Sequence, residues 1–170
     1  MKKQKGFSLI ELLIVVAIIL IIAAIAIPNL LRSKIAANES SAVGSIRTIN
    51  TSEVTYSSTW GTGFAADLPT LGGISPCTTA TALTACLIDP VLTAGSKSGY
   101  KFAAKGTLPV VVGAVTVLNG FEVNSVPVKI QTTGVRAFCA DQTGVLQFDP
   151  AGVGNAGLTS GGCVFSALGN

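Results

Sequence analysis

One apolar stretch stands out near the start of the chain. Residues Leu12 to Ile27 are 16 consecutive apolar residues, and counted from Phe7 the stretch has 21 residues, broken only by Ser8 and Glu11. An α-helix rises about 1.5 Å per residue, so a helix of this length spans a hydrocarbon core of about 30 Å. The pattern therefore predicts a helix that can cross a membrane.

The apolar positions change their spacing after this stretch. Between Asn29 and Thr59 there is no proline, and Gly44 is the only glycine. Apolar residues recur near every third or fourth position: Ile35, Ala42, Val43, Ile46, Ile49, Val54, Tyr56 and Trp60. This spacing predicts an amphipathic helix with one face on a globular part. The two segments together predict one helix of roughly 80 Å from about Phe7 to about Thr59, which Pro28 bends or loosens.

The remaining sequence changes from loop to strand patterns. Glycines and a proline in Gly61 to Gly73 predict a connecting loop, and Ala82 to Leu92 is expected to form a short helix interrupted before Pro90. From Gly99 on, runs typical of strands alternate with turn residues such as Asp141 to Gly144. The expected strands are Tyr100–Ala104, Val110–Leu118, Phe121–Ile130, Val135–Ala140 and Val145–Asp149.

The expected fold class is α+β, with a long N-terminal helix packed on a C-terminal antiparallel sheet. The expected segments are a stretch before the apolar run (1–6), the membrane-spanning helix (7–28), the amphipathic helix (29–60), a connecting loop with a short helix (61–98), and the sheet with a C-terminal loop (99–170).

The net charge of +3 is concentrated before the apolar stretch, at Lys2, Lys3 and Lys5. Without these three lysines, 8 basic residues (11 − 3) face 8 acidic ones, so no basic patch for nucleic acid is expected. Lysines beside a membrane helix favour a cytoplasmic N-terminus. The rest of the chain is then expected on the other side of the membrane.

Four cysteines all follow the apolar stretch. An even number of cysteines in this position favours disulfides in an oxidising compartment, which agrees with the orientation predicted by the lysines. Of three possible pairings, we favour the pairs nearest in sequence, Cys77 with Cys86 and Cys139 with Cys163. The second pair would tie the glycine-rich segment 152–162 to the sheet. Free buried thiols are the alternative.

Glu11 is the charged residue inside the apolar stretch. A carboxylate near the centre of a bilayer costs about 2.5–3.5 kcal/mol on insertion scales, and less near an interface. Such an acid indicates a functional site with a partner. The alternative is that Glu11 only extends to the lipid headgroups at the cytoplasmic end of the helix.

The residues around Glu11 resemble a known motif. Lys5-Gly6-Phe7-Ser8-Leu9-Ile10-Glu11-Leu12-Leu13-Ile14-Val15-Val16-Ala17-Ile18 resembles the cleavage and methylation motif of type IV prepilins, and Pro28 lies where that family has a helix kink. The C-terminal disulfide is similar to the disulfide loop of many pilins. A secretory signal peptide is the alternative, but Pro28-Asn29-Leu30 follows the stretch in place of a small-x-small cleavage site.

The resemblance implies how the N-terminus is processed. Residues 1–6 would be a leader peptide, removed by a membrane aspartyl peptidase that cuts between Gly6 and Phe7. The new amine of Phe7 would then be N-methylated. In a helical stack, Glu11 of one subunit can pair with the Phe7 amine of a neighbour. This pair would select the axial register, because an unmade pair leaves a buried charge without a partner.

The sequence gives no indication of an enzyme. It has no histidine, no phosphate-binding loop and no Cys-x-x-Cys pair, so neither a cofactor nor a metal is expected. Asp141 and Asp149 are a minor calcium-binding alternative. The sequons at Asn38 and Asn50 lie on the predicted helix and are not expected to be glycosylated.

The resemblance implies a structural subunit of a type IV pilus. The chain would be held in the inner membrane as a single-pass protein with a cytoplasmic N-terminus. It would then polymerise with identical subunits into an extracellular filament for adhesion, motility or DNA uptake. Implied partners are a prepilin peptidase and methyltransferase, a membrane assembly platform and a cytoplasmic ATPase.

Two alternatives remain open at this point. The first is a type II secretion pseudopilin, which shares the N-terminal motif and acts as a short periplasmic piston. The second is a membrane-anchored binding module that does not polymerise, which would not need Glu11. An electron-conducting filament has no support, because the helix carries no aromatic residue between Ser8 and Val54.

Overall fold

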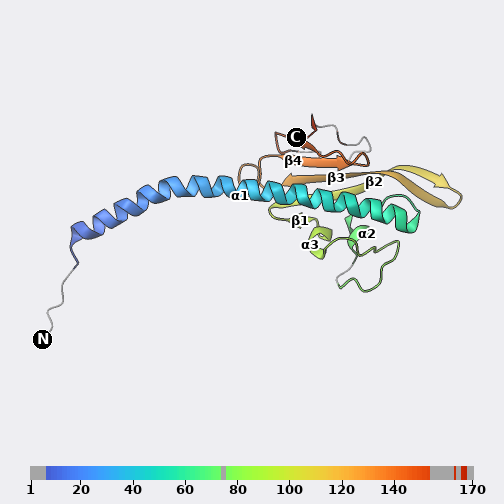
Figure 1. The fold of residues 1–170 in the computed structure, drawn as a ribbon, viewed down its shortest axis with the longest axis horizontal. Helices are drawn as coiled ribbons and strands as arrows, with labels where there is room; N and C mark the ends of the chain where they lie inside the picture. The colour runs from blue at the N-terminus through green and yellow to red at the C-terminus, as the bar shows by residue number, and fades with distance from the viewer. Residues whose placement is uncertain (1–6, 74–75, 154–162, 164–165, 168–170) are drawn as a thin grey trace. The chain divides into compact units, whose positions relative to one another are not determined.

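The computed structural model describes residues 7–73, 76–153, 163 and 166–167. The chain divides into two compact units, Met1–Lys34 and Ile35–Asn170. Helix α1, Leu9–Trp60, begins in the first unit and ends in the second, with Pro28 inside it (Figure 1). The predicted long helix is therefore confirmed to within two residues at each end. A bend at Pro28 stays a prediction.

The second unit contains a meander of six antiparallel strands, which follow one another in chain order across the sheet (Figure 1). The strands are β1 (Ser96–Lys97), β2 (Tyr100–Val112), β3 (Val115–Pro127), β4 (Ala137–Asp141), β5 (Gln147–Asp149) and β6 (Ser166–Ala167). A long helix followed by an antiparallel sheet confirms the α+β fold class.

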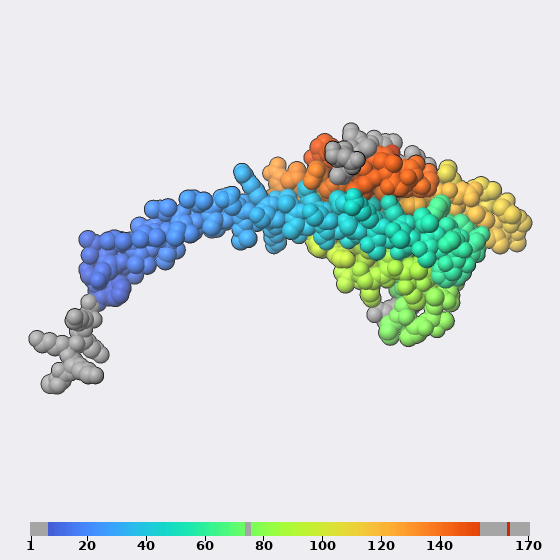
Figure 2. Space-filling model, in the orientation of Figure 1, coloured from blue at the N-terminus to red at the C-terminus, as the bar shows by residue number. Residues whose placement is uncertain are grey.

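The central hairpin of the sheet differs from its prediction. Strands β2 and β3 are paired from Tyr100 opposite Pro127 to Val112 opposite Val115, so the turn lies at residues 113–114. The hairpin projects past the end of α1 in the second unit and is yellow in Figure 2. The predicted strand Val110–Leu118 is wrong, because it runs across this turn.

Glycines caused this error. Gly106 and Gly120 look like turn residues in the sequence but lie inside β2 and β3. A Cβ atom at Gly106 would lie 2.7 Å from the carbonyl oxygen of Ala65, so this glycine allows a close approach to another segment. The true turn residue is Gly113, whose φ of +65° favours glycine.

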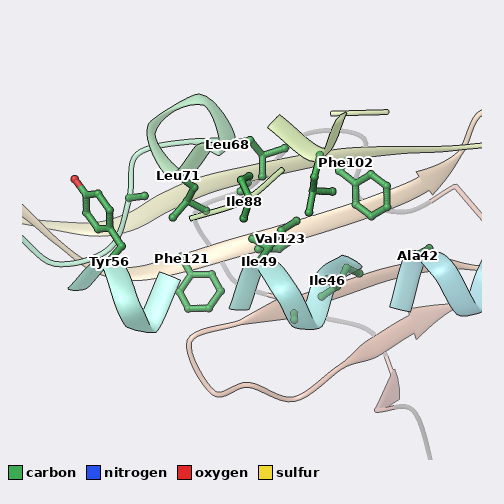
Figure 3. Packing of buried hydrophobic residues seen from close by; sticks show 14 of the residues in the cluster. Ala42, Ile46, Ile49, Tyr56, Leu68, Leu71, Ile88, Phe102, Phe121 and Val123 are labelled. Atoms are coloured by element: carbon green, nitrogen blue, oxygen red, sulfur yellow. The ribbon is translucent and has the colours of Figure 1, made fainter. Parts of the chain in front are cut away.

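The hydrophobic core lies between α1 and one face of the sheet. Side chains alternate between the faces of a strand, so Phe121 and Val123 of β3 point to the same face. Ile46 and Ile49 of α1 belong to the same buried cluster as these two side chains (Figure 3), and all four are at most 2% exposed. Burying one large apolar side chain contributes about 1.5–3 kcal/mol.

The stripe that packs α1 on the sheet is more polar than predicted. Ala42, Ile46, Ile49 and Tyr56 are buried as expected, but Val54 is 60% exposed. Four polar residues share the buried face of the helix: Glu39, Ser45, Ser52 and Glu53. The prediction was wrong at Val54 because the imperfect spacing left the exact face of the helix open.

The connection between α1 and the sheet contains two short helices and differs from the prediction. Helix α2, Leu68–Gly72, lies in the predicted loop. Helix α3, Pro90–Thr93, overlaps only the last three residues of the predicted helix Ala82–Leu92, whose other residues are not helical. Each helix has an aspartate N-cap and a proline in its first turn. Proline favours the first turn of a helix, so Pro90 begins a helix instead of ending one.

The structure forms the two disulfides that the sequence favoured. Cys77 is bonded to Cys86, with the Cα atoms 5.7 Å apart, and Cys139 of β4 is bonded to Cys163, with a Cα separation of 6.0 Å. Most of the segment that the second bond was expected to hold, residues 154–162, lies outside the described residues. Closing each loop stabilises the fold by about 2–4 kcal/mol.

Candidate functional site

The described part of the first unit presents an exposed apolar surface. Every described residue from Phe7 to Lys34 except Ala23 is exposed. The large aliphatic side chains from Leu9 to Leu31 are between 42% and 74% exposed. Among the described residues, α1 is the one helix long and apolar enough to cross a membrane. An apolar surface this large indicates contact with lipid or with other protein chains.

Glu11 lies in the first turn of α1, next to the predicted cleavage site. Gly6 lies outside the described residues, and the Phe7 side chain is 79% exposed. The Ser8 backbone N–H donates to Glu11 Oε2 at 2.9 Å. This contact is half of a capping box, in which an acid three residues after the N-cap accepts the N-cap backbone N–H.

The capping contact adds a local role to the predicted role of Glu11. The Ser8-x-x-Glu11 spacing is visible in the sequence, but the prediction above gave Glu11 only a partner on another chain or in the headgroups. A carboxylate has two oxygens that each accept hydrogen bonds. Oε2 is used within the chain, and Oε1 can accept from a second group. The pair with a neighbour's Phe7 amine requires another copy and stays a prediction.

A cluster of hydrogen bonds around Glu39 joins α1 to the segment before β4 within the second unit. Glu39 of α1 is 7% exposed. Its Oε1 accepts the backbone N–H groups of Val135 at 2.9 Å and Arg136 at 3.1 Å. Its Oε2 accepts from Arg136 Nε at 2.9 Å and Nη2 at 2.7 Å. One carboxylate therefore satisfies four donors from the segment before β4.

The electrostatics of Glu39 reflect this geometry. Burial by itself raises the pKa of Glu39, but the hydrogen bonds from Val135 and Arg136 and the guanidinium charge together lower it below 4.5. Glu39 is thus ionised at neutral pH. The guanidinium of Arg136 also lies 5.5 Å from the ring centre of Phe138 and 5.8 Å from that of Phe148. These rings favour a cation above their faces.

Glu53 is the other buried acid of α1, and it is fully buried. Its Oε2 accepts the backbone N–H of Ala65 at 2.8 Å, while Oε1 has no hydrogen-bond partner. Burial is the main reason that the pKa of Glu53 rises to about 7; the Ala65 hydrogen bond lowers it and the charge of Asp67 raises it. Near neutral pH, a large fraction of Glu53 is therefore protonated.

The other face of the sheet carries a third buried acid. Glu122 of β3 is fully buried, and its Oε1 accepts from Asn124 Nδ2 at 2.9 Å. Burial is the main cause that raises the pKa of Glu122. In the sequence Glu122 is a single scattered acid, and no pattern there predicts that Glu39 or Glu53 is buried. Their partners lie far away or in loops, so no local signal identifies them.

The two acids of the calcium alternative do not come together. Asp149 pairs with Ala137, at the opposite end of β4 from Asp141. Asp141 accepts from the backbone N–H of Thr143 at 2.9 Å, and Asp149 from that of Ala151 at 2.9 Å. In the part of the chain that the structure describes, no group of three or more cysteine or acidic side chains is placed to hold a metal.

Known proteins match this chain at its N-terminus and over one short stretch. The family model of the prokaryotic N-terminal methylation motif matches residues 1–27. Over 39 residues the chain is 62% identical to the type IV wide pilus major component PilA4 of Thermus thermophilus. That stretch covers 23% of this chain and 30% of the relative. No solved structure matches the chain significantly.

The sequence resemblance and the fold agree with these matches. The matched motif includes the apolar start of α1 and Glu11, and a helix followed by an antiparallel sheet continues the chain. The methylation motif, the pilin relative and this architecture together support the recognition of the chain as a type IV pilin.

Proposed function

We propose that the chain is a structural subunit of a type IV pilus and that α1 polymerises it with identical copies. One observation carries the proposal: the first unit is an exposed apolar helix with a single acid in its first turn. Lipid covers this surface before assembly, and the helices of neighbouring copies cover it afterwards. The relative's role in a pilus supports the same function.

Processing comes before assembly in this proposal. A prepilin peptidase removes residues 1–6 and exposes an amine on Phe7, which is then methylated. Lys2, Lys3 and Lys5 keep the N-terminus in the cytoplasm while the subunit is held in the inner membrane. A platform and a cytoplasmic ATPase then drive the subunit into a filament that serves adhesion, motility or DNA uptake.

Glu11 selects the register of the incoming subunit. Its Oε2 remains on the Ser8 N–H, and its Oε1 accepts from the methylated amine of a neighbouring Phe7. In an apolar surrounding, opposite charges attract strongly, and a missed pair leaves both charges unpaired. A subunit out of register is therefore disfavoured even though its aliphatic side chains still pack.

The test is to express the full chain in cells with a type IV pilus apparatus and to shear filaments from the surface. We expect long filaments by electron microscopy, and mass spectrometry should find a subunit that begins at N-methyl-Phe7. A subunit that keeps Met1 would overturn the processing step. A mature subunit confined to the cell envelope would indicate the pseudopilin alternative instead.

A matched pair of variants tests the role of Glu11. Glu11→Gln keeps an oxygen for the Ser8 N–H and removes the charge, whereas Glu11→Ala removes both. If the charge selects the register, both variants are processed and enter the membrane, and both lose filaments by about tenfold or more. Filaments of Glu11→Gln at the wild-type level would reduce Glu11 to a helix cap.

A further inference from the structure

Two basic residues lie at the end of the first unit, just after its apolar stretch. The side chains of Arg32 and Lys34 are exposed. Neither forms an ion pair or a side-chain hydrogen bond with a residue that the structure describes. On a helix surrounded by water, such charges are simply hydrated. Here they directly follow a segment that lipid covers in the proposed function, so a membrane surface lies beside them.

No acid of α1 neutralises these two cations. From Pro28 to Asn38 the sequence contains two basic residues and no acidic one. Glu39 follows, but both of its oxygens are already occupied by donors from Val135 and Arg136, at 2.7–3.1 Å. The helix segment after the apolar stretch therefore carries an unbalanced positive charge, which is complementary to an anionic surface.

The cations lie one membrane thickness away from Glu11. Arg32 follows Glu11 by 32 − 11 = 21 residues of the same helix. At about 1.5 Å per residue this separation is about 32 Å, and the hydrocarbon core of a bilayer is about 30 Å thick. With Glu11 at the cytoplasmic interface, Arg32 and Lys34 reach the headgroups of the far leaflet, the one opposite the cytoplasm. Long basic side chains at the ends of membrane helices extend to these headgroups.

The two cations also project from opposite sides of the helix. Each residue turns an α-helix by about 100°, so Arg32 and Lys34 point about 200° apart. One protein surface packed on the helix would contact one of these side chains and miss the other. Lipid headgroups surround a single membrane helix and can contact both. This arrangement favours lipid phosphate over a single protein neighbour as the partner.

Removal of the leader changes which end of the membrane helix carries the charge. Before cleavage, Lys2, Lys3 and Lys5 give the cytoplasmic end three basic side chains. After cleavage, that end keeps the amine of Phe7, which the carboxylate of Glu11 formally neutralises. The far end keeps both of its cations. The excess of positive charge therefore passes from the cytoplasmic end to the far end when the leader is removed.

We infer that Arg32 and Lys34 bind the phosphate groups of anionic phospholipids in the far leaflet, and that they become the main charged anchor of the subunit once residues 1–6 are removed. The inference rests on the proposed function, which holds the first unit in a membrane. One basic residue near an anionic lipid surface strengthens binding by about fivefold. A subunit that leaves the membrane for a filament has to release these lipids.

Lipid selectivity in vesicles tests the contact. The probes are trace amounts of spin-labelled phosphatidylglycerol or spin-labelled phosphatidylcholine in phosphatidylcholine vesicles that contain the peptidase-cleaved chain. Spin-label spectra measure the share of each lipid held at the protein. We expect phosphatidylglycerol to be favoured, and Arg32→Gln with Lys34→Gln to reduce this preference by about fivefold or more. The matched control is Arg47→Gln with Lys129→Gln, which removes two exposed cations of the second unit.

A charge-conserving variant protects the test against a change in folding or insertion. Arg32→Lys with Lys34→Arg keeps both charges and should keep the preference for phosphatidylglycerol. The inference would be overturned by an unchanged preference in the double glutamine variant, by an equal loss in the control pair, or by a loss in the charge-conserving variant.

The uncleaved chain tests the change of anchor. Its three N-terminal lysines also bind anionic lipid, so the double glutamine variant should lose a smaller part of its preference than in the cleaved chain. Equal losses in both forms would contradict the change of anchor. Normal filaments from a chain without any preference for phosphatidylglycerol would overturn this inference alone. A wild-type chain that does not insert into vesicles would overturn the membrane-held state of the proposed function as well.

Discussion

The two units use apolar and acidic residues of the same helix in opposite ways. In the first unit, the large aliphatic side chains of α1 are exposed, and none of the residues that the structure describes covers them. In the second unit, the aliphatic side chains of Ile46 and Ile49 are buried, and two acids, Glu39 and Glu53, are buried with them. The first unit therefore needs lipid or other chains to cover its apolar side chains, as proposed above, whereas the second buries its own.

The buried acids have a common task. Irregular segments leave backbone N–H groups without partners, and a buried N–H without a hydrogen bond is costly. Glu39 accepts such groups from Val135 and Arg136, and Glu53 accepts one from Ala65. Helix α1 thus fixes the position of two loops of the second unit through its acids, and the apolar side chains supply most of the cohesion.

The strongest way to break this arrangement is to remove Glu39. Glu39→Ala leaves two backbone N–H groups and the Arg136 guanidinium without their acceptor, so we expect a loss of about 4 kcal/mol in the free energy of unfolding. Denaturant unfolding of the full chain in detergent, followed by Trp60 fluorescence, measures it. Glu39→Gln keeps one acceptor and should cost less; an equal loss in both variants would show that charge alone matters.

Because the pKa of Glu53 is raised, we expect the free energy of unfolding of the second unit to depend on pH. Its pKa rises from 4.5 to about 7 on folding, so the folded state binds more protons than the unfolded state between these values. Stability is therefore highest at low pH in this window and falls as the pH rises through 7, by about 3 kcal/mol in total. The matched variant Glu53→Gln should remove this part of the pH dependence. An unchanged pH profile in that variant would contradict the assignment.

We expect the smallest change in the free energy of unfolding at Val54. A substitution there tests which residues of α1 belong to its buried face. Because its side chain is 60% exposed in a single chain, Val54→Ser should change the free energy of unfolding by less than about 0.5 kcal/mol. The control is Ile46→Ala, where a fully buried side chain is truncated and about 2–5 kcal/mol is lost. Similar losses at both positions would mean that the helix packs with a different face.

The sequence predicted those features that depend on nearby residues. The extent of α1 follows from the long apolar and amphipathic pattern, and the disulfide partners are the nearest cysteines. The acids were missed because their partners are remote: Arg136 is 97 residues from Glu39. The hairpin turn was misplaced because Gly106 and Gly120 serve close packing, which depends on segments that the local sequence does not identify.

The unbroken course of α1 through the first unit has a further consequence for the proposed passage of the chain from lipid into a filament. A helix satisfies its interior backbone hydrogen bonds within itself, in oil as well as among protein chains. Exchange between the two environments then requires no refolding of the transferred segment. If the chain assembles as proposed, its subunits can therefore pass from the membrane into a filament without unfolding this segment.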